Sequence, residues 1–140
     1  MIMKNRRSFI TGIKSTKLTK YEIFFLKKYK PWGVILFERN INSINQVYKL
    51  TSKIKKIFKD KNYPILIDQE GGKVDRLKKI IDTSFFTSNF FGKLYMKDVK
   101  KFKIHYKIYI KQTAYLLNKI GININTVPVL DVRNKIGDRI

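Results

Sequence analysis

Apolar residues follow two alternating patterns along the 140-residue chain. Short apolar runs at residues 8–12, 33–37, 64–68 and 122–127 predict four strands, and near-continuous runs are typical of strands in parallel sheets. Between them, apolar residues at helical intervals predict three helices, at about residues 19–29, 43–60 and 98–120. Residues 85–91 fit neither pattern and are expected to be irregular.

Signals at the helix ends agree with these limits. Thr19 with Glu22, and Ser43 with Gln46, have the spacing of a capping box. Gly121 stands where a glycine commonly ends a helix. Strands and helices therefore alternate, which is the order of parallel βαβ units with right-handed crossovers.

This order predicts an α/β fold that forms the N-terminal half of a (β/α)8 barrel of the TIM type, with about four parallel strands and intervening helices. A full barrel needs about 250 residues, so residues 1–140 are expected to form a partial barrel domain, truncated at the C-terminus. An open four-stranded sheet is the alternative. It is less favoured because no glycine-rich nucleotide loop follows the first strand.

The charge of the chain raises the question of a nucleic-acid partner. Its formal value is +21, with 31 basic residues against 10 acidic ones, and such a charge suggests nucleic acid or an anionic membrane. However, 25 of the basic residues are lysine, spread along the whole chain, whereas nucleic-acid readers rely on arginine. General compositional drift is therefore favoured, and no specific nucleic-acid partner is expected.

The remaining composition narrows the class further. Cysteine is absent, which excludes disulfides, thiolate metal sites and a cysteine nucleophile. The basic N-terminus is followed by an apolar stretch of only Phe9 and Ile10, too short for a secretory signal. No apolar run reaches the ~20 residues that span a bilayer. We expect a soluble, cytoplasmic protein with no membrane span, metal ion or other cofactor.

Carboxylates occur where the predicted strands end, which in barrels is where functional groups lie. Glu38 follows the second run, Asp68 ends the third and Glu70 lies two residues beyond it, and Asp131 follows the fourth. Taken singly, Asp68 could cap a turn, and the two glutamates could neutralise nearby lysines. We assign no catalytic role to Glu38 or Glu70.

Several segments together resemble a known family. Residues 32–40 (WGVILFERN), 65–77 (ILIDQEGGKVDRL), 121–123 (GIN) and 128–132 (PVLDV) resemble successive motifs of family 3 glycoside hydrolases, of the bacterial β-N-acetylglucosaminidase (β-N-acetylhexosaminidase) type. Residues 136–139 (IGDR) resemble the segment that follows. The similarity covers nearly the whole chain, in order and at family-like spacing, so chance explains it poorly.

The resemblance implies a set of substrate-binding residues. Asp68 matches the aspartate that accepts hydrogen bonds from sugar hydroxyls in the subsite before the scissile bond. Arg76 matches an arginine that shapes this subsite, and Arg139 matches one that reaches sugar hydroxyls. Asp131 is expected to support the site. These roles suit the chemistry, because a carboxylate accepts from vicinal hydroxyls and a guanidinium donates in a fixed fork.

The resemblance also implies an activity, a retaining exo-β-N-acetylglucosaminidase that trims N-acetylglucosamine from muropeptides in peptidoglycan recycling. Such an enzyme needs a nucleophile and an acid/base. In this family they are an aspartate far downstream and a histidine in a Lys-His-Phe-Pro-Gly-His-Gly loop, and neither segment occurs before Ile140. The chain is therefore expected to be the sugar-binding part, inactive without a C-terminal half.

Two alternatives stay open: a basic nucleic-acid-binding module and a non-catalytic sugar-binding relative. The first can be tested by titrating DNA or RNA at increasing salt concentration. Tight binding that weakens steeply with salt, as counterion release demands, would favour the nucleic-acid module. We expect no specific binding.

Overall fold

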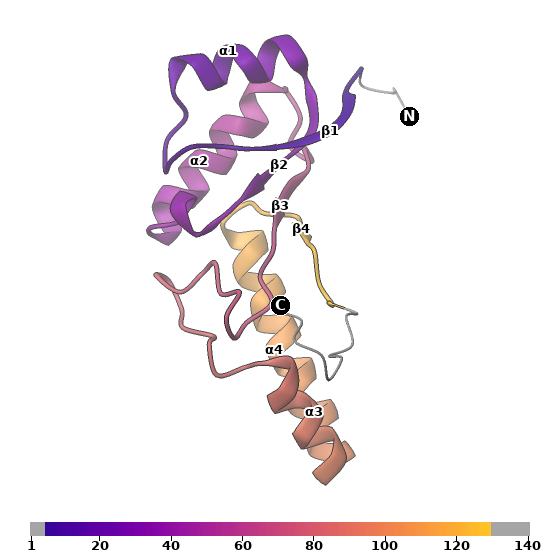
Figure 1. The fold of residues 1–140 in the computed structure, drawn as a ribbon. Coiled ribbons are helices and arrows are strands. Elements are labelled where there is room, and N and C mark those ends of the chain that lie inside the picture. The colour runs from indigo at the N-terminus through magenta and orange to yellow at the C-terminus, as the bar shows by residue number, and fades with distance from the viewer. Residues whose placement is uncertain (1–4, 130–140) are drawn as a thin grey trace, which may run out of the picture.

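Figure 1 shows the computed structural model of the chain, in which residues 5–129 are described. Four strands pair in parallel in the order β1-β2-β3-β4: β1 (Arg7–Gly12), β2 (Pro31–Leu36), β3 (Ile65–Ile67) and β4 (Ile124–Asn125). The predicted α/β class with parallel strands is confirmed. The last strand differs most from its prediction, because only two of its residues are in strand conformation.

The three predicted helices are present as α1 (Lys20–Tyr29), α2 (Ile44–Ile57) and α4 (Val99–Lys119), and a short 3-10 helix, η1 (Glu38–Asn40), follows β2. Thr19 caps α1 with both hydrogen bonds of a capping box. At α2 the box is half formed. Ser43 accepts from the backbone N–H of Gln46, but the Gln46 side chain accepts from the backbone N–H of Asn42.

A further helix, α3 (Ser88–Lys97), lies in and beyond the stretch that was expected to be irregular. Thr87 caps it by accepting a hydrogen bond from the N–H of Phe90 at 2.9 Å. The expectation was wrong because the apolar residues here do recur at helical spacing, but the first turn has no acidic residue to signal a helix start. Aromatic contacts hold α3 against α4, with Phe91 and Tyr106 ring centroids 4.8 Å apart.

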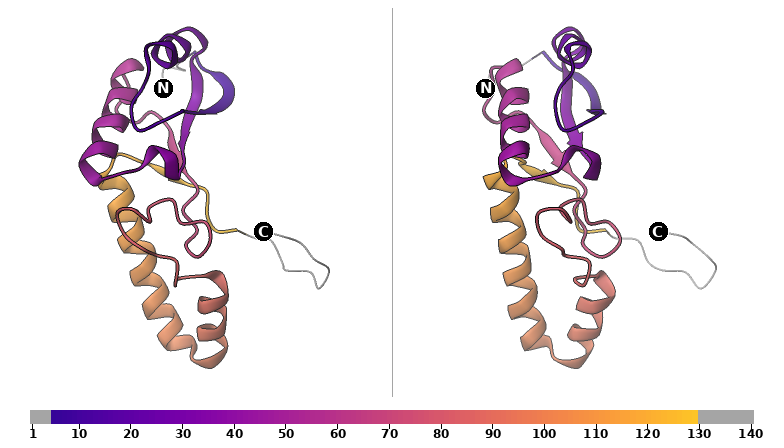
Figure 2. Two further views of the ribbon diagram at one scale, coloured as in Figure 1. Left: turned by 60° about the vertical axis from the view of Figure 1, so that its left-hand side comes forward. Right: turned by 90° about the vertical axis from the view of Figure 1, so that its left-hand side faces the viewer.

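The core lies between the strands and three helices. Its strand side includes Val34 and Leu36 of β2 and Ile65 and Ile67 of β3, all fully buried. Its helix side is formed by Leu26 of α1, by Val47, Leu50 and Ile54 of α2, by Leu117 of α4 and by Ile120, which caps the C-terminal end of α4. Figure 2 shows α2 and the C-terminal end of α4 on the same side of the strands. Sequential parallel strands with helices on one side form the wall of half a (β/α)8 barrel.

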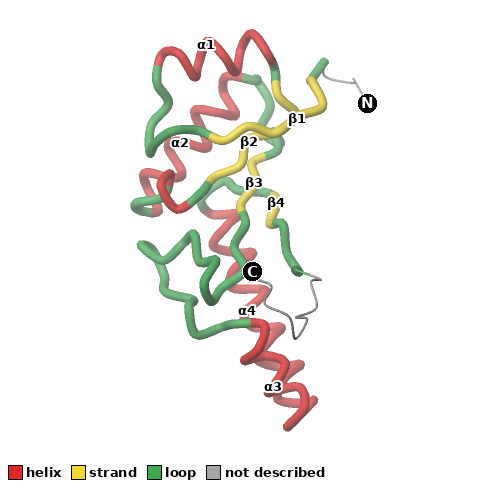
Figure 3. The backbone as a smooth tube through the Cα atoms, viewed as in Figure 1, coloured by secondary structure: helices red, strands yellow, loops and turns green. Residues whose placement is uncertain are grey.

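The N-terminal half of α4 extends beyond the strands. Figure 3 shows it paired with α3, away from the sheet. Its exposed apolar side chains include Ile104, Ile108 and Ile110. Within residues 5–129, no helix combines the length and apolar character needed to cross a membrane.

Thr51 joins α2 to the end of α4 through a buried hydrogen bond. Its hydroxyl donates to the carbonyl of Ile120 at 2.8 Å, and both residues are almost fully buried. Next to this contact, Gly121 has a φ of +81°, and a Cβ there would lie 2.4 Å from the Thr51 oxygen. The packing of α2 against the α4 terminus therefore depends on both residues.

Replacing Thr51 by valine should lower the free energy of unfolding by about 1–3 kcal/mol, because the buried Ile120 carbonyl loses its side-chain partner. Chemical denaturation measures this loss. Ser52→Ala, one residue further along α2, is the matched control and should change stability little. Equal stability of Thr51→Val and the parent chain would contradict the role of this contact.

Candidate functional site

Three residues at the ends of neighbouring strands lie level across the sheet. Leu36 of β2 pairs with Ile67 of β3, and Ile67 pairs with Asn125 of β4. The next residues, Phe37, Asp68 and Thr126, therefore stand side by side at the carboxyl edge. Side chains at the same level of adjacent parallel strands face the same way. In barrels this edge is the mouth where functional groups gather.

Asp68 has a hydrogen-bond donor on each carboxylate oxygen. Its Oδ2 accepts from Nη2 of Arg76 at 3.4 Å, and its Oδ1 accepts from the hydroxyl of Thr126 at 3.2 Å. The side chains of Asp68 and Arg76 are 28% and 26% exposed. The carboxylate is thus held on two sides and still reaches solvent.

The contact with Asp68 does not use all the N–H donors of Arg76. Its Nε is buried and has no hydrogen-bond partner. Its guanidinium lies 5.8 Å from the ring centre of Phe37, and that of Arg39 lies 4.6 Å from the same ring. Arg39 is anchored by donating from Nε to the carbonyl of Ile13 at 3.1 Å. The mouth therefore combines two guanidinium groups, one aromatic ring and one carboxylate.

The loop between Asp68 and Arg76 is fixed by the buried amide of Gln69, which is only 2% exposed. Its Nε2 donates to Asp75 Oδ1 at 3.0 Å and to Thr83 Oγ1 at 2.9 Å. Its Oε1 accepts from the N–H of Leu77 at 3.0 Å. The backbone of Gln69 also exchanges two hydrogen bonds with the side chain of Asn125. This network sets where Arg76 stands relative to the strand end.

Gly71 lets the loop pass close to its neighbours. Its φ is +83°, and a Cβ would lie 2.5 Å from the carbonyl oxygen of Phe86 and 2.8 Å from the hydroxyl of Tyr109. The Tyr109 hydroxyl in turn donates to the carbonyl of Glu70 at 3.4 Å. Burial raises the pKa of Tyr109, so this hydroxyl keeps its proton at neutral pH. The loop is therefore supported from α4.

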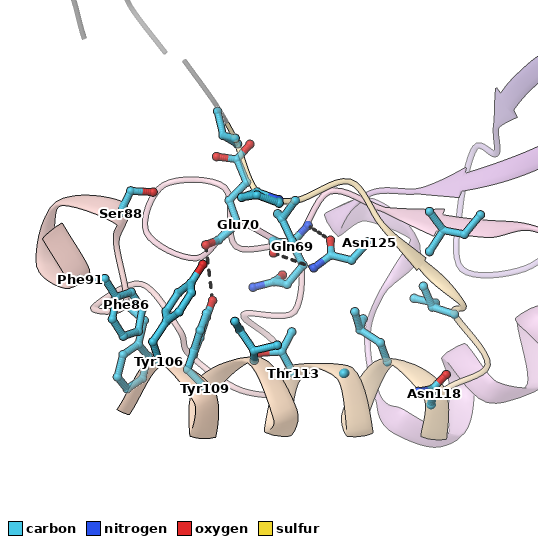
Figure 4. A pocket seen from close by; sticks show the side chains of 18 of the residues that line it. Gln69, Glu70, Phe86, Ser88, Phe91, Tyr106, Tyr109, Thr113, Asn118 and Asn125 are labelled. Carbon is cyan, nitrogen blue, oxygen red and sulfur yellow. Dashed lines mark hydrogen bonds between the residues drawn. The ribbon is translucent and has the colours of Figure 1, made fainter. Parts of the chain in front are cut away.

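A separate apolar groove of about 620 Å³ runs between α4, α3 and the β4 segment. Figure 4 shows Tyr106 and Tyr109 rising from α4 toward Glu70, with Gln69 and Asn125 joined above them. Other lining residues are Phe86, Phe91, Ile110, Leu117, Val127 and Pro128. Asp68 does not line the groove, so the mouth and the groove are distinct features that share residues 69 and 70.

The predicted site residues are only partly described. The structure brings Asp68 and Arg76 together, although their role in binding stays a prediction. Asp131 and Arg139 lie outside the described residues. Sequence reasoning missed Thr126, because the fourth strand was extended to residue 127 and its end was sought at Asp131. In the described part of the chain, no cluster of His, Asp and Glu side chains could hold a metal ion.

Comparison with known proteins identifies relatives. No protein-family model matches the chain. A β-hexosaminidase of Haemophilus ducreyi is 34% identical over 93% of this chain and 38% of its own length. The structure of NagZ from Neisseria gonorrhoeae in complex with N-trifluoroacetyl-D-glucosamine is 30% identical, with a TM-score of 0.78 over 91% of this chain and 38% of that one. A family 3 β-N-acetylglucosaminidase from Paenibacillus is 25% identical, with a TM-score of 0.70 over 89% of this chain and 23% of that one.

The half barrel is therefore of the kind found in the N-terminal barrel domain of these glycoside hydrolases. More narrowly, about nine tenths of the chain is similar to the N-terminal portion of family 3 glycoside hydrolases of the β-N-acetylglucosaminidase type. It spans less than half the length of these relatives.

Gln69→Ala should destabilise the chain by about 3 kcal/mol or more, because it leaves several buried polar groups without hydrogen-bond partners. Each such group costs about 1–3 kcal/mol when unpaired. Thermal or chemical unfolding measures this. Gln112→Ala, at an exposed position of α4, is the control and should stay within about 0.5 kcal/mol of the parent. Similar behaviour of the two variants would show that the network does not hold the loop.

Proposed function

We propose that this chain is the sugar-binding part of a retaining exo-β-N-acetylglucosaminidase, with Asp68 accepting hydrogen bonds from the sugar. The observation that carries the proposal is the placement of Asp68 at the carboxyl end of β3, where its side chain is partly exposed and held through both oxygens. Each carboxylate oxygen has two lone pairs, so each can accept a further bond from a sugar hydroxyl. Vicinal hydroxyls of a pyranose suit this pair of acceptors.

Arg76 would act beside Asp68. One of its Nη groups holds the carboxylate, and the side chain is 26% exposed, so other N–H groups of the guanidinium can reach a ligand. A sugar hydroxyl or ring oxygen is a fitting acceptor for the remaining donors. By the family resemblance, Arg139 would be a second donor to the sugar and Asp131 a supporting residue.

N-acetylglucosamine is the sugar we propose for this subsite. The Neisseria relative is solved with N-trifluoroacetyl-D-glucosamine, which is a glucosamine derivative of that kind. The proposed natural substrate is an N-acetylglucosamine-containing glycan or muropeptide, processed in the cytoplasm during peptidoglycan recycling. Residues 1–140 would form part of the barrel domain of such an enzyme.

Hydrolysis would require groups that the 140 residues do not supply. By the family resemblance, the nucleophile and the histidine loop would belong to a C-terminal part, and the relatives are more than twice as long as the region that the chain matches. Within the described residues, β4 pairs with β3 alone, so its other edge is available to the next strand. The apolar groove beside α4 is the place where the accompanying helix would pack. Together they would receive the second half of the barrel.

An assay on an aryl N-acetyl-β-glucosaminide tests this function. We expect no turnover by the chain alone and turnover once the downstream half is present. In the completed protein, Asp68→Ala should lower kcat/KM by about 100-fold or more, because two hydrogen bonds to a charged acceptor are each worth about 1.5 kcal/mol or more.

The matched control is Asp98→Ser, which removes a carboxylate at the start of α4 and keeps a capping hydroxyl. It should leave kcat/KM unchanged. If the completed protein shows no turnover, the proposed enzymatic activity is contradicted. Sugar binding that is retained in that case would indicate a non-catalytic relative. Full activity of Asp68→Ala would contradict the role of Asp68.

A further inference from the structure

Thr126 contacts the proposed sugar-binding carboxylate from the neighbouring strand. It is the first residue after β4 and stands level with Asp68, the first residue after β3. Its hydroxyl lies 3.2 Å from Asp68 Oδ1 and 3.3 Å from the carbonyl oxygen of Ile67. The single hydroxyl proton has two candidate acceptors.

The carboxylate of Asp68 is the preferred acceptor of that proton. The carbonyl of Ile67 already accepts the backbone N–H of Thr126 at 3.0 Å, so it does not depend on the hydroxyl. A hydrogen bond to an ionised oxygen is also stronger than one to a neutral carbonyl. The hydroxyl of Thr126 is therefore available to Asp68.

We propose that Thr126 is a positioning residue that fixes the orientation of the Asp68 carboxylate for the sugar, an inference that rests on the proposed function. Arg76 binds one oxygen and Thr126 binds the other, so the plane of the carboxylate is set from both sides. Without the hydroxyl, Asp68 can turn both oxygens toward Arg76, because guanidinium and carboxylate favour a two-point contact. Oδ1 of Asp68 then moves away from the position in which it would accept a hydrogen bond from the sugar.

Thr126→Val tests the hydroxyl while keeping the branched shape of the side chain. We expect its dissociation constant for free N-acetylglucosamine, measured by NMR titration of the 140-residue chain, to rise about three- to ten-fold. Thr126→Ser restores the donor and should bind within about two-fold of the parent. Thr11→Val, whose hydroxyl at the end of β1 donates to the carbonyl of Gly12, is the matched control and should bind normally.

Stability separates positioning from a merely structural role. Branched side chains favour extended backbone, so a structural role predicts that valine is tolerated better than serine. Positioning predicts the reverse order for sugar binding. Opposite orders in unfolding and in binding support the inference, while a loss of binding that follows the loss of stability overturns it.

Asp68→Ala distinguishes failure of this inference from failure of the proposed function. If Asp68→Ala abolishes sugar binding and Thr126→Val does not weaken it, only the positioning role is overturned. If the parent chain does not bind the sugar, or Asp68→Ala binds it normally, both the proposed function and the positioning role of Thr126 are contradicted.

Discussion

The buried amide of Gln69 is the constraint on which the mouth depends. It follows Asp68 directly, and its backbone is tied to Asn125 on one side while its side chain holds the loop on the other. The contact between Asp68 and Arg76 is partly exposed and 3.4 Å long, and such ion pairs contribute little by themselves. The network around Gln69 therefore fixes the position of the loop and brings Arg76 to Asp68. The ion pair itself is too weak to hold the loop.

The alternation of strands and helices could be predicted from the sequence because it depends on local spacing and caps such as Thr19 with Glu22. The position of Asp68 followed from the rule that barrel sites lie at strand ends. The contact of Thr126 with Asp68 joins residues 58 positions apart, and that of Asn125 with Gln69 joins residues 56 apart. No local pattern encodes such partners, because strand register decides them.

Mouth and groove are linked through residues 69 and 70. Asp68 faces the mouth, whereas Gln69 and Glu70 line the groove beside α4. The hydroxyl of Tyr109 supports the loop from the groove side by donating to the carbonyl of Glu70. Filling the groove with a further barrel helix would bury these contacts and remove water that competes for them. Completion of the barrel would thus stiffen the loop that carries Arg76, the partner of Asp68.

The charge of the chain bears on what can fill the groove. With 10 acidic residues against 31 basic ones, one-to-one pairing still leaves 21 positive charges unmatched. Two copies of this chain would repel each other, and a net charge far from zero keeps proteins apart. The same charge attracts a surface rich in carboxylates. Among the described residues the outer edge of β4 has no partner strand, and this edge and the apolar groove would therefore suit a less basic segment better than a second copy of the same chain.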